Sequence, residues 1–102
     1  MSEKPKDIMF AQACNMAMAK AMEDDPKVIL MGEDIADEQG GGVFKVTLGL
    51  SERFGTDRVR STPISEQAIV GAAVGSAMVG YKPVAEIMLM NFITVAMDQI
   101  VN

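Results

Sequence analysis

The sequence contains no histidine, and this absence excludes several kinds of chemistry within its 102 residues. Without an imidazole there is no histidine general base, no Ser-His or Cys-His nucleophile pair and no imidazole metal ligand. The single cysteine, Cys14, cannot form an internal disulfide or a thiolate zinc site. We therefore expect these residues to hold no metal ion.

Aromatic and basic residues are also scarce. The chain has four Phe, one Tyr and no Trp, and its nine Lys and Arg residues face fourteen Asp and Glu residues, for a formal net charge of −5. A nucleic-acid surface needs a basic stripe, and a base-stacking platform needs aromatic side chains. We therefore expect no nucleic-acid partner.

Long apolar runs are missing too. No stretch reaches the roughly 20 uninterrupted apolar residues that span a bilayer, and the longest candidate, residues 68–79, is interrupted by Gly71, Gly75 and Ser76. The first seven residues, MSEKPKD, are charged and show no signal peptide. These features predict a cytoplasmic protein that does not associate with a membrane.

What the sequence does contain is a regular alternation of helical and extended patterns. Residues 1–7 form an N-terminal tail, and the patterns after it predict helices over 8–24, 43–54, 66–80 and from about 91 onward, and strands over 28–31, 58–60 and 84–88. This order predicts an α/β fold of three layers, with a mostly parallel sheet flanked by helices. Because the apolar pattern of the last helix runs unbroken to the end, residues 8–102 are expected to be an incomplete domain.

Ligands of parallel sheets gather at the carboxyl ends of the strands. Three segments are predicted to meet at that edge: residues 32–34, 62–66 and 88–92. They bring Glu33, Asp34 and Glu66 to one place. Spacing alone favours an ordinary explanation for Glu66, which is a carboxylate in the first turn of a helix, stabilised by about 0.3–1 kcal/mol through the helix dipole.

Three other features have a structural explanation beside a functional one. Glu86 interrupts an apolar strand, so it must lie at a sheet edge or be paired. Gly71 and Gly75 are four residues apart on a predicted helix, a spacing that suits close packing in the core and at a subunit interface equally. The run Gly40–Gly42 matches no phosphate-binding motif, and it predicts a flexible loop.

The segment 62–75, TPISEQAIVGAAVG, resembles the β subunit of thiamine-diphosphate-dependent 2-oxo acid dehydrogenases and of acetoin dehydrogenase. Four more segments agree in order and spacing: LMGED at 30–34, GVF at 42–44, KPVAE at 82–86 and DQIVN at 98–102. Together they cover almost the whole chain from Ile8 onward. The resemblance implies a transketolase-like pyrimidine-binding domain, of which this chain is the N-terminal part.

The resemblance also implies thiamine diphosphate as the cofactor. The family's key glutamate falls on Glu66, whose carboxyl would hydrogen-bond N1′ of the aminopyrimidine and favour the imino form that removes the C2 proton and gives the ylid. Glu33 matches a position near the reactive end of the cofactor. Ile64, Met88 and Phe92 match further cofactor-binding positions, and the last two would give the pyrimidine apolar surroundings.

In this family the cofactor lies between the β subunit and an α subunit that binds the diphosphate and Mg²⁺. The resemblance therefore implies an α subunit, a second β subunit and a lipoyl acyltransferase as partners, with the acyl unit passed to the lipoyl group. Pyruvate, a branched-chain 2-oxo acid and acetoin all stay open as substrates. The alternative is a non-catalytic oligomerisation or binding module, whose methionine-rich helices only bind partners.

Overall fold

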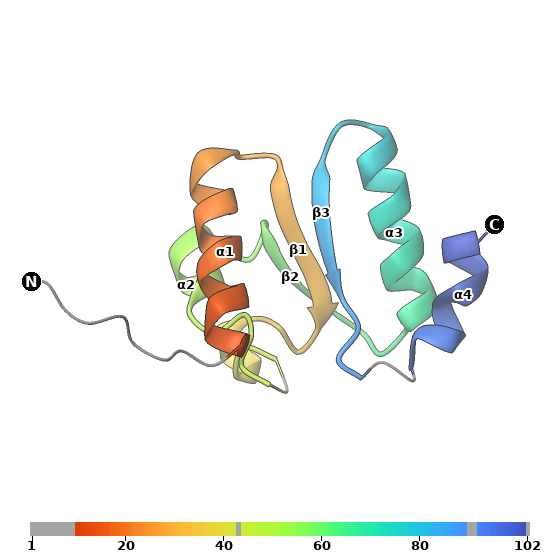
Figure 1. Ribbon diagram of the computed structural model, residues 1–102, viewed down its shortest axis with the longest axis horizontal. Coiled ribbons are helices and arrows are strands. Elements are labelled where there is room, and N and C mark those ends of the chain that lie inside the picture. The colour runs from red at the N-terminus through yellow and green to blue at the C-terminus, as the bar shows by residue number, and fades with distance from the viewer. Residues whose placement is uncertain (1–9, 43, 90–91, 102) are drawn as a thin grey trace, which may run out of the picture.

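A small parallel sheet forms the centre of the structure (Figure 1), a computed structural model that describes residues 10–42, 44–89 and 92–101. Strands β1 (Val28–Glu33), β2 (Val59–Thr62) and β3 (Lys82–Glu86) pair in the order β2-β1-β3. Both pairings are parallel, and Gly32 of β1 lies opposite Ser61 on one side and Glu86 on the other. The carboxyl ends of all three strands therefore meet at one edge of the sheet.

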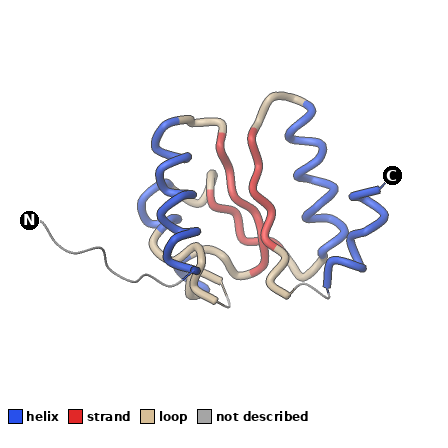
Figure 2. The backbone as a smooth tube through the Cα atoms, viewed as in Figure 1, coloured by secondary structure: helices blue, strands red, loops and turns tan. Residues whose placement is uncertain are grey.

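Helices cover both faces of this sheet (Figures 1 and 2). Helices α1 (Phe10–Asp24) and α2 (Leu50–Phe54) lie on one face. Helix α3 (Glu66–Met78) covers the other face, and α4 (Ile93–Val101) packs against α3. A short 3-10 helix, η1 (Asp37–Gln39), follows β1. This arrangement confirms the predicted three-layer α/β fold.

The main core lies between the sheet and the α1–α2 face. Its buried side chains are Met22, Val28, Leu30, Ile35, Leu50 and Val59. Burying one such side chain fully stabilises the fold by about 1.5–3 kcal/mol. On the opposite face, Met31 lines a small cavity together with Ile69 of α3. Since β1 is covered on both faces, its unbroken apolar run is that of a central parallel strand.

The segment before α2 is not the helix that the sequence predicts. A helix was expected over 43–54, but only Leu50–Phe54 is helical, and Val43 lies outside the described residues. Lys45 has a φ of 63° and Gly49 a φ of 87°, both in the left-handed region. A right-handed helix cannot continue through such residues, so the prediction was wrong for this stretch.

The strand boundaries also shift from those predicted. β1 extends beyond Met31 to Glu33, and β2 continues to Thr62. β3 covers Lys82–Glu86 instead of 84–88. The extension of β1 matters for the site, because it places Glu33 in the sheet instead of in the following loop.

Among the described residues, no helix is long and apolar enough to cross a membrane.

Within the part of the chain that the structure describes, β3 lies at one edge of the sheet and contains a proline. The Lys82 N–H donates to the carbonyl oxygen of Lys27, which directly precedes β1, at 2.9 Å. Backbone groups of successive strand residues point to opposite sides, so Pro83 and Ala85 turn theirs to the open side of the sheet. The N–H that Pro83 lacks is therefore not needed for pairing with β1.

Candidate functional site: a buried carboxyl pair at the sheet edge

Two glutamates meet at the carboxyl edge of the sheet. Glu33 ends β1 opposite Thr62, and Glu66 is the first residue of α3, which follows β2 after a short loop. Their exposed fractions are 6% for Glu33 and 9% for Glu66. Among the described residues they are the only buried acidic or basic side chains. The parallel topology thus brings together two acids that are far apart in the sequence.

Helix α3 starts as the sequence predicts. Ser65 is the N-cap, and its side-chain oxygen accepts a hydrogen bond from the Ala68 N–H at 3.4 Å. Such a cap satisfies one of the backbone N–H groups that the first turn leaves without a partner. Glu66 therefore enters the site from a fixed first turn, and the positive end of the helix dipole favours negative charge there.

The pair has unusual electrostatics. Burial raises the pKa of Glu33, and the Glu66 carboxyl beside it raises that pKa further through hydrogen bonding and charge repulsion. The backbone N–H of Ser65 acts in the opposite direction, and the charge of Asp34 adds to the increase. Glu33 Oε2 is buried and has no hydrogen-bond partner in the described part of the chain. Since two adjacent carboxyls resist ionising together, we take Glu33 as the member that retains a proton.

Gly32 positions the strand end that carries Glu33. A Cβ atom added at Gly32 would lie 3.0 Å from the Cβ of Glu86 and 3.0 Å from Cγ2 of Ile35. Only glycine therefore allows β1, β3 and the loop after β1 to approach this closely. The sequence shows Gly32 only as part of the LMGED segment, because its neighbours come from distant parts of the chain.

The three apolar candidates lie at the same edge. Met88 follows β3 and Phe92 precedes α4, and both side chains are half-buried. Ile64 lies in the loop between β2 and α3 and is 82% exposed. Figure 1 shows the connections after β1, β2 and β3 gathered at the lower end of the sheet. The structure thus brings Glu33 and Glu66 together and leaves Ile64 turned to solvent.

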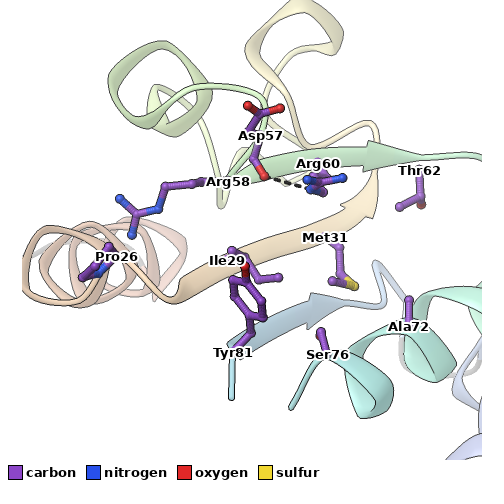
Figure 3. A pocket seen from close by; sticks show the side chains of 10 residues that line it. All are labelled: Pro26, Ile29, Met31, Asp57, Arg58, Arg60, Thr62, Ala72, Ser76 and Tyr81. Carbon is purple, nitrogen blue, oxygen red and sulfur yellow. Dashed lines mark hydrogen bonds between the residues drawn. The ribbon is translucent and has the colours of Figure 1, made fainter. Parts of the chain in front are cut away.

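Two cavities lie between the sheet and α3. The larger, of about 700 Å³, is bordered by side chains of β1, β2 and α3 (Figure 3). The smaller, of about 230 Å³, includes Pro63 and Ser65 in its lining. Thr62 lines both, and its Oγ1 is buried with no hydrogen-bond partner among the described residues. Neither cavity is lined by Glu33 or Glu66, so the carboxyl pair is a separate feature of the edge.

The fold and the carboxyl pair together define a class of protein: a parallel α/β domain that presents buried acids where its strands end. Residues 6–102 match the family described as the transketolase pyrimidine-binding domain, and the chain belongs to this family. The family expected from the motifs is therefore confirmed.

Among the described residues, no group of three or more Cys, Asp or Glu side chains could hold a metal ion.

Several curated relatives are similar over almost the whole chain. The β subunit of 2-oxoisovalerate dehydrogenase from Bacillus subtilis is 45% identical over 93 residues, which are 91% of this chain and 28% of the relative. The mitochondrial pyruvate dehydrogenase E1 component β subunit of Chaetomium thermophilum is 46% identical over 97 residues, 95% of this chain and 25% of the relative. The β subunit of acetoin:2,6-dichlorophenolindophenol oxidoreductase from Bacillus subtilis is 44% identical, covering 93% of this chain and 31% of the relative. The chain thus spans less than a third of the length of each.

Proposed function

We propose that this chain forms the pyrimidine-binding part of the β subunit of a thiamine-diphosphate-dependent dehydrogenase. The observation that carries the proposal is the buried pair formed by Glu33, at the end of β1, and Glu66, at the start of α3. The relatives support the reaction class, because their names are those of β subunits acting as dehydrogenases or oxidoreductases on 2-oxo acids or acetoin. Pyruvate, a branched-chain 2-oxo acid and acetoin are the candidate substrates.

The residues at this edge fit an aminopyrimidine ring. Such a ring offers a nitrogen acceptor and an amino group, and a buried carboxyl with an unpartnered oxygen is a suitable partner for them. Glu33 Oε2 is such an oxygen. The half-buried side chains of Met88 and Phe92 offer apolar surface for the ring faces. Ile64 offers an exposed apolar side chain to a group bound across the edge.

In this proposal Glu66 controls a proton at N1′ of the ring. Its carboxylate would accept a hydrogen bond from the protonated form of that nitrogen and so favour a proton at that position. Burial and the neighbouring Glu66 raise the pKa of Glu33, which favours its protonated form, and that form would donate a hydrogen bond to the Glu66 carboxylate. When bound, thiamine diphosphate supplies the thiazolium carbon that adds to the substrate carbonyl. The chain supplies orientation, exclusion of water and control of the proton.

The partners in this proposal follow from the resemblance. We assign the diphosphate and Mg²⁺ to an α subunit, and we expect a second β subunit and a lipoyl acyltransferase in the assembly. Passage of the acyl unit to the lipoyl group belongs to the same proposal. The cytoplasmic location stays a prediction, since one of the relatives is named as mitochondrial.

The substitution Glu66→Gln tests the role of this carboxyl. Within the complete β subunit paired with its α subunit, the variant should assemble normally and slow proton exchange at C2 of the bound cofactor by about 10²–10⁴-fold, the usual effect of removing a positioned acid–base group. Exchange is measured by quenched deuterium labelling and NMR. Glu52→Gln, at an exposed position of α2, is the control and should leave exchange unchanged. Near wild-type exchange in Glu66→Gln would remove Glu66 from this role.

A further inference from the structure

Three hydroxyl side chains from different segments bind the turn directly after β1. The Thr47 hydroxyl donates to the carbonyl oxygen of Ile35 at 2.8 Å. The backbone N–H groups of the next two residues donate to Ser61 of β2 and to Ser51 of α2, at 2.9 and 2.8 Å respectively. Consecutive residues of the turn are therefore each held by one hydroxyl. We call Thr47, Ser51 and Ser61 the hydroxyl clamp.

The clamp acts on the backbone that follows Glu33. Glu33 ends β1, and the next residue, Asp34, has a φ of 58°, so the chain leaves the sheet in the left-handed region. Beyond that turn Ile35 is fully buried, and its Cγ2 lies 3.0 Å from the position of a Cβ at Gly32. The backbone on both sides of Glu33 is thus held, by the sheet on one side and by the clamp on the other.

Thr47 is the member of the clamp that is hardest to replace. Its exposed fraction is 2%, whereas Ser61 is exposed. Water can take the place of an exposed hydroxyl, but a buried carbonyl oxygen that loses its donor bears the full cost of desolvation. Without the Thr47 hydroxyl, the turn should shift toward another donor, and Glu33 lies only two residues before the carbonyl concerned.

The titratable groups that face the Glu33 carboxyl in the described part of the chain are acidic. Glu66 approaches it from α3, and Asp34 adds negative charge from the turn itself. Thr62, the β2 residue opposite Glu33, does not titrate. Glu86 of β3 lies opposite the preceding residue of β1, so its side chain points to the other face of the sheet. The ionisation of Glu33 therefore depends on how closely Glu66 approaches it.

We propose that Thr47, as part of the hydroxyl clamp, is a positioning residue that holds the Glu33 carboxyl against Glu66. The inference rests on the proposed function, in which Glu66 acts on the aminopyrimidine and Glu33 supports it. Thr47 acts through the turn and not on the cofactor itself. All the bonds of the clamp lie within the described chain.

A pair of substitutions at Thr47 tests this role in the complete β subunit paired with its α subunit. Thr47→Val removes the hydroxyl and keeps the shape of the side chain, whereas Thr47→Ser keeps the hydroxyl. In the enzyme without cofactor, infrared difference spectroscopy over a pH series follows the protonated carboxyl band that Glu33→Gln removes. In Thr47→Val the pKa of Glu33 should fall toward its usual range, because a displaced carboxyl gains water and moves away from Glu66. In Thr47→Ser the band should titrate as in the wild type.

Activation of the bound cofactor gives a second measurement. Proton exchange at C2 of thiamine diphosphate should slow by about tenfold in Thr47→Val, less than in Glu66→Gln, because the acid is misplaced but present. Thr47→Ser should keep the wild-type rate. Thr56→Val, the same substitution at an exposed position, is the control and should also leave exchange unchanged.

If Thr47→Val does not assemble, Ser61→Ala serves instead. It removes another hydroxyl of the clamp at an exposed position, and it should change the infrared titration and the exchange rate in the same directions.

Two results would overturn the inference. The first is a Glu33 band that titrates as in the wild type while the variant is less stable, which would make the clamp purely structural. The second is unchanged C2 exchange in Thr47→Val when Glu66→Gln does slow exchange. The infrared titration needs no cofactor, so it tests the position of Glu33 separately from the proposed function, which the Glu66→Gln variant decides.

Discussion

Gly32 and Gly75 are in opposite situations, although both are glycines in regular secondary structure. Gly32 is enclosed, with atoms of Glu86 and Ile35 at 3.0 Å from the position of a Cβ. Gly75, on α3, has no atom within 4 Å of that position. The first glycine is therefore required by packing, whereas the second leaves a helical position without a side chain. Between them, Gly71 faces the Gln99 side chain of α4, so its small size serves packing within the chain.

The substitutions Gly32→Ala and Gly75→Ala should consequently change stability in opposite directions. Overpacking at Gly32 should lower the free energy of unfolding by about 1–3 kcal/mol. At Gly75, alanine should raise it by about 0.5–1 kcal/mol, because glycine is a poor helix former. Urea denaturation of the two variants measures both effects. Equal changes in the two variants would contradict the packing described for Gly32.

The sequence predicts single residues well where the signal is local. Ser65 was expected as the N-cap of α3, and Glu33 and Glu66 were expected at one edge of a parallel sheet, because caps and strand ends follow from neighbouring residues. The direct contact of the two carboxyls and the enclosure of Gly32 were beyond such reasoning. Both depend on how closely separate strands and helices approach each other, and the residues next to each position in the sequence do not determine that distance.

Helix α2 depends on contacts with the rest of the fold. It has only five residues, too few to be stable by itself. The Asp37 carboxylate holds it from outside, accepting hydrogen bonds from the N–H groups of Gly49 and Glu52 and from the Ser51 hydroxyl, at 2.5, 2.8 and 3.0 Å respectively. Burial by itself would raise the pKa of Asp37, but these donors outweigh it and lower the pKa.

Removing that carboxylate should loosen the helix. Asp37→Ala should lower the free energy of unfolding at neutral pH by about 1–2 kcal/mol, the upper part of the range for losing a helix cap. Asp57→Ala, at an exposed position, is the control and should change stability by less than about 0.5 kcal/mol. Chemical denaturation followed by circular dichroism compares the two. Similar small effects in both variants would show that α2 does not depend on Asp37.

The same region explains where prediction of the elements failed. Val46, Leu50 and Phe54 have helical spacing, so a helix through them was a reasonable prediction. The structure uses the first part of that segment as a turn, held by the Asn15 amide, which donates to the carbonyl oxygens of Val46 and Leu48 at 2.8 and 2.9 Å. The donor, Asn15, belongs to α1, which is far away in the sequence. Its hydrogen bonds stabilise the turn relative to the helix that was predicted for this segment.

At the scale of the whole molecule, four acidic side chains have shifted pKa values. Their combined effect predicts that stability is greatest near pH 4. The pKa values of Asp25 and Asp37 are lowered from 3.8, so the stability they provide is lost as the pH falls below that value. The pKa values of Glu33 and Glu86 are raised from 4.5, so the stability of their protonated forms is lost as the pH rises above it.

Urea denaturation between pH 3 and pH 8 measures this dependence. The variant Glu33→Gln/Glu86→Gln should show a flatter decline above pH 4.5, and Asp37→Ala a flatter decline below pH 3.8. A wild-type stability that rises steadily from pH 4.5 to pH 7 would contradict the raised pKa values of the two glutamates.

The overall architecture could be predicted because alternating strands and helices allow few arrangements. The apolar run of β1 indicated a central strand, and the order of elements indicated a parallel sheet with helices on both faces. The surroundings of Glu86 could not be predicted in the same way. The sequence showed that Glu86 needed an edge or a partner, and the structure places it in the edge strand of the described sheet, with its Oε1 atom buried and without a hydrogen-bond partner among the described residues.

Pro83 has a consequence for how the chain behaves at high concentration. An open strand edge can pair with an extended segment of another molecule, and the growth of amyloid-like aggregates starts at such edges. On β3 the residues that turn their backbone outward include Pro83, which has no N–H to offer an incoming strand. In the 102-residue chain, this edge of the described sheet is thereby protected against continuous pairing. Replacing this proline would remove a barrier to fibril formation while leaving every bond of the native sheet in place.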